Sequence, residues 1–314
     1  MSAMLPRRPR LTRPGLFVTA TDTAVGKTVA ACAIAWRLRR GGAAVGVCKP
    51  LATGCRRERE GLVSEDAEAL AHFADCRQPL DTINPIRYAR ALSPAAAAEI
   101  EDRAPDFDAL VRSLEQLDDA GDYLVIEGVG GLMVPLDAAR PNVTVLDLAA
   151  ELGYPVAVVC RAGLGTLNHT AMTVRLLREA GCDVAGLIIN GYVPDPGEPL
   201  AEAVKQADAA GASHGPPRPA SRRWRGSAKG GKGATGVAAD APPPSLGADP
   251  RDLSMISNRI WLQRMNRTAI LATIPALPAA AVAPHKGVIP EAVLDAVGLT
   301  YWPDVLKPPA SYEL

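Results

Sequence analysis

The most constraining feature of this chain is a loop that separates an apolar run from a helix-forming run. Residues 16–18 are apolar, residues 20–28 read Ala-Thr-Asp-Thr-Ala-Val-Gly-Lys-Thr, and residues 29–40 favour a helix. A loop that ends in Gly-Lys-Thr presents backbone N–H groups to phosphate oxygens. Its lysine neutralises phosphate charge and its threonine hydroxyl suits Mg²⁺. The chain is therefore predicted to bind a nucleoside triphosphate.

The same loop departs from the usual phosphate-loop pattern at its first position. Ala20 stands where a glycine is expected, which is compatible with the loop if the φ angle of Ala20 is negative. The residues expected to line the nucleotide are Thr21, Asp22, Thr23, Ala24, Val25, Gly26, Lys27 and Thr28.

Short apolar runs alternate with helix-forming segments along most of the chain. Strands are predicted at 16–19, 45–48, 123–127, 156–160, 184–190 and 269–274, and helices at 29–40, 65–73, 107–117, 143–152 and 167–180. Continuous apolar runs are typical of strands buried on both faces. The alternation predicts an α/β fold, namely a P-loop NTPase-like parallel sheet with helices on both faces. In such sheets, ligands bind beyond the carboxyl ends of the strands.

The composition predicts one domain that is interrupted by an insertion. We expect a basic N-terminal extension at 1–14, an α/β core at 15–193, and the C-terminal part of the core with a short, proline-rich tail at 252–314. Residues 194–251 are rich in Pro, Gly and Ala, so they are predicted to be a flexible insertion. Basic residues cluster around Trp224, and we interpret them as part of a solvated linker rather than as a polyanion-binding arm.

The charge balance and the cysteines limit the function classes. Lys plus Arg and Asp plus Glu both number 34, so no net field recruits nucleic acid or an anionic membrane. No apolar run approaches the length of a membrane span. The six cysteines lack the spacing of a zinc site or a disulfide framework, which predicts a reducing, cytoplasmic location. Either Met1 or Met4 is compatible with the true start.

Charged residues follow two of the predicted strands at the expected ligand edge. Lys49 ends the second strand and precedes a proline, so Lys27 and Lys49 together would surround a dense anion. Glu127 ends an apolar strand beside a glycine turn, the position of a metal-binding Walker B carboxylate. Asp66 opens a helix, where an acid also serves the helix dipole.

A second glycine-containing loop, at 163–170, precedes another helix. Its N–H groups suit an anionic group of a second ligand, such as a carboxylate. His169 is interpreted as a structural histidine within this helix start rather than a general base. Asn190 ends a strand and is interpreted either as a reader of a base edge or as part of a turn with Gly191.

Taken together, these motifs resemble the dethiobiotin synthetase family. The resemblance covers about residues 15–193, resumes weakly near 257–277 and is specific because the motifs occur in the family's order. Its motifs are Thr21–Thr28, Lys49-Pro50 with Thr53-Gly54, Asp66, Ser93-Pro94, the 127–131 segment Glu-Gly-Val-Gly-Gly, and the 164–169 segment Leu-Gly-Thr-Leu-Asn-His.

The resemblance implies an ATP-dependent cyclo-ligase that forms the ureido ring of dethiobiotin. The substrates would be 7,8-diaminopelargonate, carbon dioxide and ATP, with Mg²⁺ as cofactor. A substrate amine would trap carbon dioxide as a carbamate, which attacks the γ-phosphorus to give a carbamic–phosphoric anhydride. The second amine would then close the ring and expel phosphate.

The resemblance also assigns roles to residues, and it implies a homodimer with shared active sites. Catalytic roles fall to Lys27, Lys49, Thr23 and Thr53, and metal binding to Thr28, Asp66 and Glu127. Substrate would contact Thr53, Ser93, Pro94, Gly128 and Gly130 of one subunit, and Gly165 and Asn168 of its neighbour. Asn190 would read the adenine, and Gly130 would also line the nucleotide.

Three alternatives share the phosphate-loop scaffold. A glutamine-dependent amidoligase would need an added glutaminase domain, for which the chain has no room. A partition-type ATPase switch carries a signature lysine early in the loop, where this chain has Asp22. A nucleotide-binding but inactive paralogue stays open because of Ala20 and Ala24, the latter at a position where some family members carry glutamate.

Overall fold

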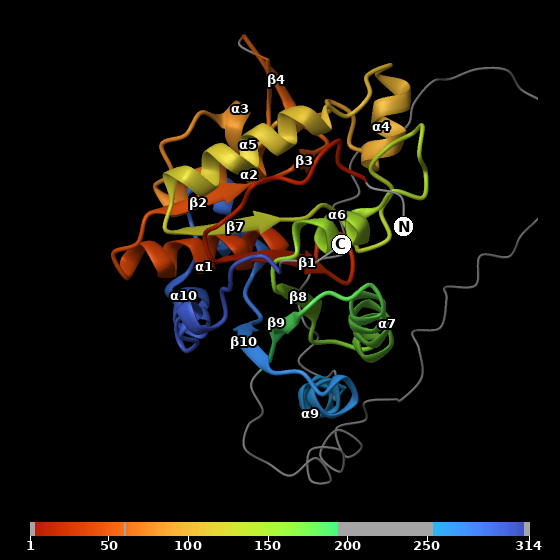
Figure 1. The fold of residues 1–314 in the computed structure, drawn as a ribbon. Helices are drawn as coiled ribbons and strands as arrows, with labels where there is room; N and C mark the ends of the chain where they lie inside the picture. The colour runs from red at the N-terminus through yellow and green to blue at the C-terminus, as the bar shows by residue number, and fades with distance from the viewer. Residues whose placement is uncertain (1–3, 60, 194–253, 311–314) are drawn as a thin grey trace, which may run out of the picture.

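Six parallel strands form the central sheet of the computed structural model, which describes residues 4–59, 61–193 and 254–310 (Figure 1). Their order across the sheet is β10-β9-β8-β1-β7-β2. The strands are β1 (Gly15–Ala20), β2 (Val45–Cys48), β7 (Tyr123–Glu127), β8 (Val156–Arg161), β9 (Val184–Tyr192) and β10 (Ile270–Pro275). The predicted parallel α/β sheet is confirmed.

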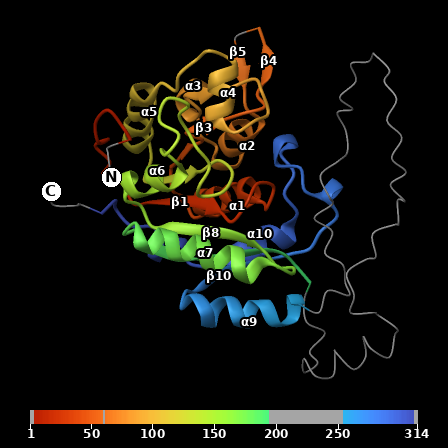
Figure 2. The ribbon, with the colours of Figure 1, turned by 90° about the vertical axis from the view of Figure 1, so that its right-hand side faces the viewer.

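Helices cover both faces of this sheet. Figure 1 shows α10 and α7 on opposite sides of the strands β8 to β10, and Figure 2 shows α9 running beside α7. The described helices are α1 (Lys27–Arg40), α2 (Glu65–Ala74), α3 (Leu80–Ile83), α4 (Pro94–Ile100), α5 (Phe107–Ala120), α6 (Val145–Leu152), α7 (Thr166–Glu179), α9 (Ser254–Asn266) and α10 (Glu291–Gly298).

Several short strands lie at the edge of the domain beyond β2. They form two small sheets, one parallel and one antiparallel, that were not predicted because two- and three-residue strands leave no periodic pattern. These strands are β3 (Leu51–Ala52) with β6 (Ile86–Arg87), and β4 (Arg56–Glu58) with β5 (Gly61–Val63). Three short 3₁₀ turns follow in the described C-terminal part of the chain, namely η1 (Ala279–Ala281), η2 (Pro284–Lys286) and η3 (Trp302–Asp304).

The C-terminal part contains more structure than the expected proline-rich tail. Helix α9 was not predicted because Ile260, Trp261 and Met265 are exposed, so its apolar residues do not mark one face. Helix α10 follows Pro290 and is only eight residues long. Trp302 is buried and its indole N–H donates to the carbonyl of Val297, so this segment packs into the core.

The N-terminal residues from Met4 also lie against the domain. The Glu151 carboxylate accepts the backbone N–H groups of Met4 and Leu5. Both of these side chains are buried. The buried Asp118 in α5 accepts N–H groups from Thr12 and Arg13. The predicted insertion at 194–251 lies outside the described residues.

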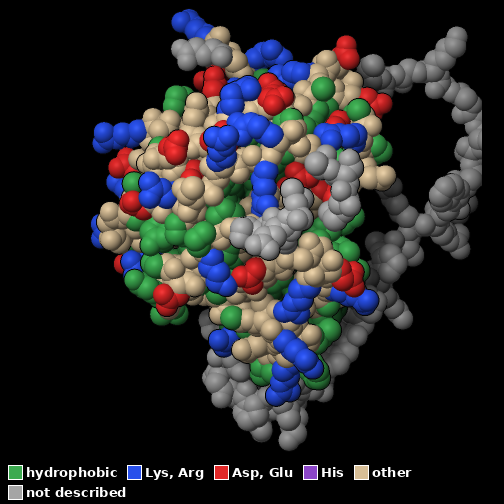
Figure 3. Space-filling view, in the orientation of Figure 1, with side chains coloured by type: hydrophobic (Ala, Val, Ile, Leu, Met, Phe, Trp, Pro, Cys, Tyr) green, Lys and Arg blue, Asp and Glu red, His purple; other side chains and the backbone are tan. Residues whose placement is uncertain are grey.

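The displayed surface (Figure 3) carries charges of both signs, as the balanced composition predicts, and the cysteines are unpaired. Figure 3 shows Lys and Arg interspersed with Asp and Glu on the displayed face. All six cysteines carry free thiols. Within the described ranges, we find no helix with the length and apolar character needed to cross a membrane.

The register of the sheet determines which strand ends meet. Val18 of β1 pairs with Glu127 of β7, and Cys48 of β2 pairs with Ile126. Lys49, which follows Cys48, is therefore level with Glu127 at the carboxyl edge. The loop after β1 emerges between β7 and β8 at the same edge. The sheet thus brings the phosphate loop, Lys49 and Glu127 together.

Candidate active site

The phosphate loop has the backbone conformation that its sequence needs. Ala20 is the last residue of β1 and is extended, so the missing glycine is tolerated. Gly26 caps α1 with a φ of 96°, and Ala24 also has a left-handed φ of 56°. A left-handed alanine stores about 1–2 kcal/mol of strain. Ala24 therefore adds local backbone strain to the loop.

Asn190 packs against this loop from β9. Its side-chain amide donates to the carbonyl of Val25 at 2.9 Å, and a Cβ on Gly26 would overlap the same amide. Asn190 therefore supports the loop directly, in addition to the base-reading role that the resemblance implies. The alternative of a turn at Asn190 and Gly191 was wrong: β9 continues to Tyr192, and the left-handed φ of 77° at Gly191 coincides with an irregularity in its pairing with β10.

Lys49 is the buried centre of a cluster of charged and polar side chains. Its ammonium nitrogen lies 2.6 Å from Oε1 of Glu127 and 2.7 Å from Oδ2 of Asp66. The hydroxyl of Thr28 donates toward both acids, at 2.8 Å from Glu127 Oε1 and 3.1 Å from Asp66 Oδ1. The side chain of Lys49 is 3% exposed and that of Glu127 is 0% exposed. Four predicted site residues thus meet at one point.

The charged groups of this cluster shift one another's pKa values. Burial would lower the pKa of Lys49, but the carboxylates of Asp66 and Glu127 raise it above its ordinary value. Lys49 in turn lowers the pKa of Asp66. Burial raises the pKa of Glu127 despite its contact with Lys49. Lys49 is therefore a permanent cation at neutral pH.

Lys27 is the second cation of the site. Its ammonium nitrogen donates to the carbonyl of Asp22 at 3.1 Å. Burial, together with repulsion from Lys49, lowers the pKa of Lys27 to about 8. A cation that is weakly satisfied by the protein gains from an incoming anion. The loop is therefore prepared for a polyanionic ligand.

The residues present fit a magnesium ion. Oε2 of Glu127 is buried and has no hydrogen-bond partner in the structure, beside the Asp66 carboxylate and the Thr28 hydroxyl. Mg²⁺ prefers such oxygen ligands and keeps other positions for phosphate and water. Among the described residues, no group of three or more His, Cys, Asp and Glu side chains is placed to hold a metal ion.

The glycine turn after Glu127 lies beside the phosphate loop. A Cβ on Gly130 would lie 2.7 Å from the Val134 side chain and 3.6 Å from the hydroxyl of Thr23. Gly130 also has a φ of 59°. Gly128 continues the sheet by donating its N–H to the carbonyl of Val18. The structure therefore brings Thr23 and this turn together.

The predicted diamine-binding residues lie on two loops that are hydrogen-bonded to each other. Thr53 follows β3, and the N–H of Gly54 donates to the carbonyl of Arg90 at 3.0 Å. Ser93 caps α4 and its carbonyl accepts the N–H of Ala97. Pro94 is the first residue of that helix. The two loops are thus adjacent, while the contact of these side chains with a substrate stays a prediction.

Gly165 and Asn168 lie at the start of α7, which follows β8. Gly165 caps α7 with a φ of 90°, and Asn168 is exposed in the first turn. Their contact with the substrate of a neighbouring subunit stays a prediction. His169 is exposed in the same turn, and its interpretation as a structural histidine rather than a general base stays a prediction. The buried face of α7 carries threonines and aliphatic residues instead.

Two residues of this region were missed by the sequence analysis. The side-chain amide of Asn84 donates to the carbonyl of Lys49 at 2.5 Å and is almost fully buried. Arg161, at the end of β8, forms a 2.8 Å ion pair with Asp22 in the phosphate loop. Position at a strand end was a usable signal for Arg161. Asn84 carried none, because its partner is fixed only by the tertiary fold.

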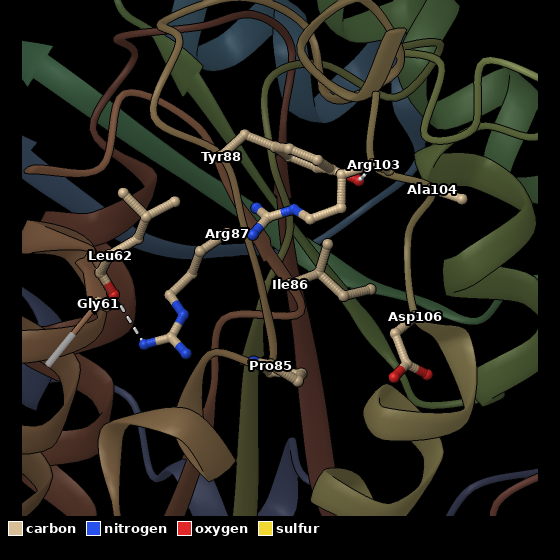
Figure 4. Close-up of a pocket in the computed structure, with 9 residues that line it drawn as sticks. All are labelled: Gly61, Leu62, Pro85, Ile86, Arg87, Tyr88, Arg103, Ala104 and Asp106. Carbon is tan, nitrogen blue, oxygen red and sulfur yellow. Dashed lines mark hydrogen bonds between the residues drawn. The ribbon is translucent and has the colours of Figure 1, made fainter. Parts of the chain in front are cut away.

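A separate hollow of about 470 Å³ lies beside β6 (Figure 4). In it, Arg87 donates to the carbonyl of Leu62, and the Arg103 guanidinium lies over the ring of Tyr88. None of its lining residues belongs to the predicted site.

Comparisons with known proteins identify the family of this chain. A family model described as an AAA domain matches residues 14–282. The ATP-dependent dethiobiotin synthetase BioD of Anaeromyxobacter sp. (strain K) is 47% identical over 189 residues, covering 59% of this chain and 81% of that protein. The chain belongs to the dethiobiotin synthetase family.

Other relatives extend the family comparison. The synthetase of Thermodesulfovibrio yellowstonii is 40% identical over 58% of this chain and 78% of its own length. Among solved structures, the septum site-determining protein MinD of Pyrococcus horikoshii OT3, complexed with Mg-ADP, has a TM-score of 0.44 and 15% identity, covering 91% of this chain and 93% of that one. A similarity at that level does not bear on function.

Proposed function

We propose that this chain is an ATP-dependent dethiobiotin synthetase that acts on 7,8-diaminopelargonate and carbon dioxide. The observation that carries the proposal is the buried Lys49, held between Asp66 and Glu127 at the edge where the phosphate loop emerges. Two anions, a carbamate and a triphosphate, repel each other. A site that forces them together needs fixed cations in a water-poor environment.

The residues are arranged for three successive bond changes. One substrate amine adds to carbon dioxide, loses a proton and becomes a carbamate. A carbamate oxygen attacks the γ-phosphorus, and the bond to ADP breaks. The second amine attacks the carbonyl carbon, loses a proton, and phosphate leaves with the oxygen that the carbamate supplied.

In this sequence, Lys27 and Lys49 neutralise the carbamate and the γ-phosphate. Asn84 and the two acids restrict Lys49 to one position, so little reorganisation is needed. We assign Thr23 and Thr53 to hydrogen bonds with the reacting groups. Thr28, Asp66 and Glu127 would hold Mg²⁺, which neutralises charge on the phosphate oxygens when bound.

The remaining roles concern binding. Ser93 and Pro94 would border the diamine, Gly128 and Gly130 would admit it close to the backbone, and Asn190 would contact the base. Gly165 and Asn168 would hold the substrate carboxylate of the neighbouring subunit, which makes the proposed assembly a homodimer. The six free thiols support a cytoplasmic location.

A coupled assay of phosphate release tests this function. The expected result is release that requires ATP, the diamine and bicarbonate together, with each omission reducing it to background. Release without diamine and bicarbonate would instead indicate a switch ATPase. ATP binding without release under any condition would indicate an inactive paralogue.

A further inference from the structure

The loop between β8 and α7 is held by a side chain from a distant part of the chain. Asn258, in α9, is 4% exposed. Its amide nitrogen donates to the carbonyl of Ala162 at 2.8 Å and to that of Gly163 at 3.1 Å. It also lies 3.3 Å from the hydroxyl of Ser254. One buried amide thus fixes two successive peptide carbonyls.

These two carbonyls directly precede the N-terminus of α7. The N–H of Ala162 donates to the carbonyl of Asn190 at 3.0 Å, so both backbone polar groups of Ala162 are hydrogen-bonded. Gly165 then turns the chain into the helix with a φ of 90°. The carbonyl of Gly163 also accepts the N–H of Thr166, the first residue of α7, at 3.3 Å. Asn258 therefore contacts the carbonyl that anchors the helix start, and the next N–H groups of the first turn have no acceptor within the helix.

We infer that Asn258 is a positioning residue for the carboxylate end of the diamine substrate. It does not touch the substrate. It orients the β8–α7 loop, and this loop presents the amides of the α7 N-terminus. The inference rests on the proposed function, which assigns the substrate carboxylate to Gly165 and Asn168.

A matched control is present on the same helix. Asn266 is 3% exposed and its amide donates to the carbonyl of Leu262 at 2.8 Å, one turn back in α9. It therefore has the same side chain, burial and type of hydrogen bond as Asn258. The partner of its amide lies within α9, so loss of this hydrogen bond leaves the β8–α7 loop in place.

Calorimetric titration of the full-length protein tests the inference with two probes, 7,8-diaminopelargonate and the same diamine with a methyl group in place of the carboxylate. Asn258→Ala is expected to weaken binding of the first probe about tenfold and to leave the second within about twofold. The KM for ATP stays unchanged. Asn266→Ala lowers the melting temperature but leaves the ratio between the probes at the wild-type value.

A second variant covers the case in which the alanine variant does not fold. Asn258→Asp keeps the shape and replaces the donating nitrogen with an oxygen, so the same loss of carboxylate preference is expected. A wild-type ratio in the folded variants overturns the inference. Equal binding of both probes by the wild-type protein also overturns it. Wild-type protein that binds neither probe and releases no phosphate contradicts the proposed function itself.

Discussion

At the scale of single residues, Lys49 combines two properties that usually exclude each other. It is almost completely buried and it is charged, because Asp66 and Glu127 compensate for the lost solvation. Such an arrangement contributes little net stability, since desolvation offsets the attraction. Its value lies in holding a cation in place before the substrates arrive.

Lys49→Met is predicted to abolish turnover while ATP binding changes only modestly. Loss of a preorganised cation lowers kcat by about 100-fold or more. The unpaired Glu127 lowers the free energy of unfolding by about 3 kcal/mol, and Lys49→Met/Glu127→Gln recovers stability but not turnover. Phosphate release, ATP titration and urea unfolding measure these effects. Equal losses of turnover and ATP binding would make Lys49 a simple phosphate anchor.

Lys27 gives a pH dependence with a definite sign. Its pKa is about 8 in the ligand-free protein against 10.5 in the unfolded chain. Its charge therefore destabilises the fold below pH 8, and this cost is lost as the pH rises from about 8 to 10.5. ATP favours the ammonium form, so binding at pH 8 is predicted to take up about half a proton.

Calorimetry in buffers of different ionisation enthalpy measures that uptake. Lys27→Arg is the control, because a guanidinium stays protonated and should remove this contribution to the uptake. Equal uptake in the arginine variant would show that another group titrates.

At the scale of elements, the strand ends explain how much of the site the sequence predicts. The apolar runs end at the charged residues, so Lys49 and Glu127 could be placed from their order alone. Asn84 and Asn258 could not, because their partners are 35 and 96 residues away. Neither residue belongs to a periodic pattern or a local motif. The same holds for α9, whose exposed Trp261 obscures its buried face.

The N-terminal segment provides a test at this scale. Asp118 in α5 is 1% exposed and accepts hydrogen bonds from the N–H groups of Thr12 and Arg13 and from the Thr12 hydroxyl. Asp118→Ala is predicted to lower the free energy of unfolding by about 2–3 kcal/mol, because it leaves these donors unsatisfied.

Urea unfolding measures this loss, and Asp119→Ala is the neighbouring exposed control. The control should change stability by less than about 0.5 kcal/mol. Equal effects of the two substitutions would mean that the segment does not depend on Asp118.

At the scale of the whole molecule, the proposed homodimer builds each active site from two subunits. In this proposal, one subunit contributes Lys49 to a given site and the other contributes Asn168. Mixing inactive Lys49→Met protein with inactive Asn168→Ala protein is predicted to restore about a quarter of wild-type turnover, since half of the dimers carry one intact site. Phosphate release after subunit exchange measures the recovery. No recovery, with exchange demonstrated, would place both residues in one subunit's site.

The central claim is that Lys27 and Lys49 bring a carbamate into contact with the γ-phosphate of ATP. The most direct measurement follows oxygen from ¹⁸O-labelled carbon dioxide into the released phosphate, at times short enough to limit exchange with water. If a carbamate oxygen attacks phosphorus, one labelled oxygen appears in each phosphate released. Phosphate that carries oxygen only from water would show that ATP is hydrolysed, and would contradict the proposed reaction.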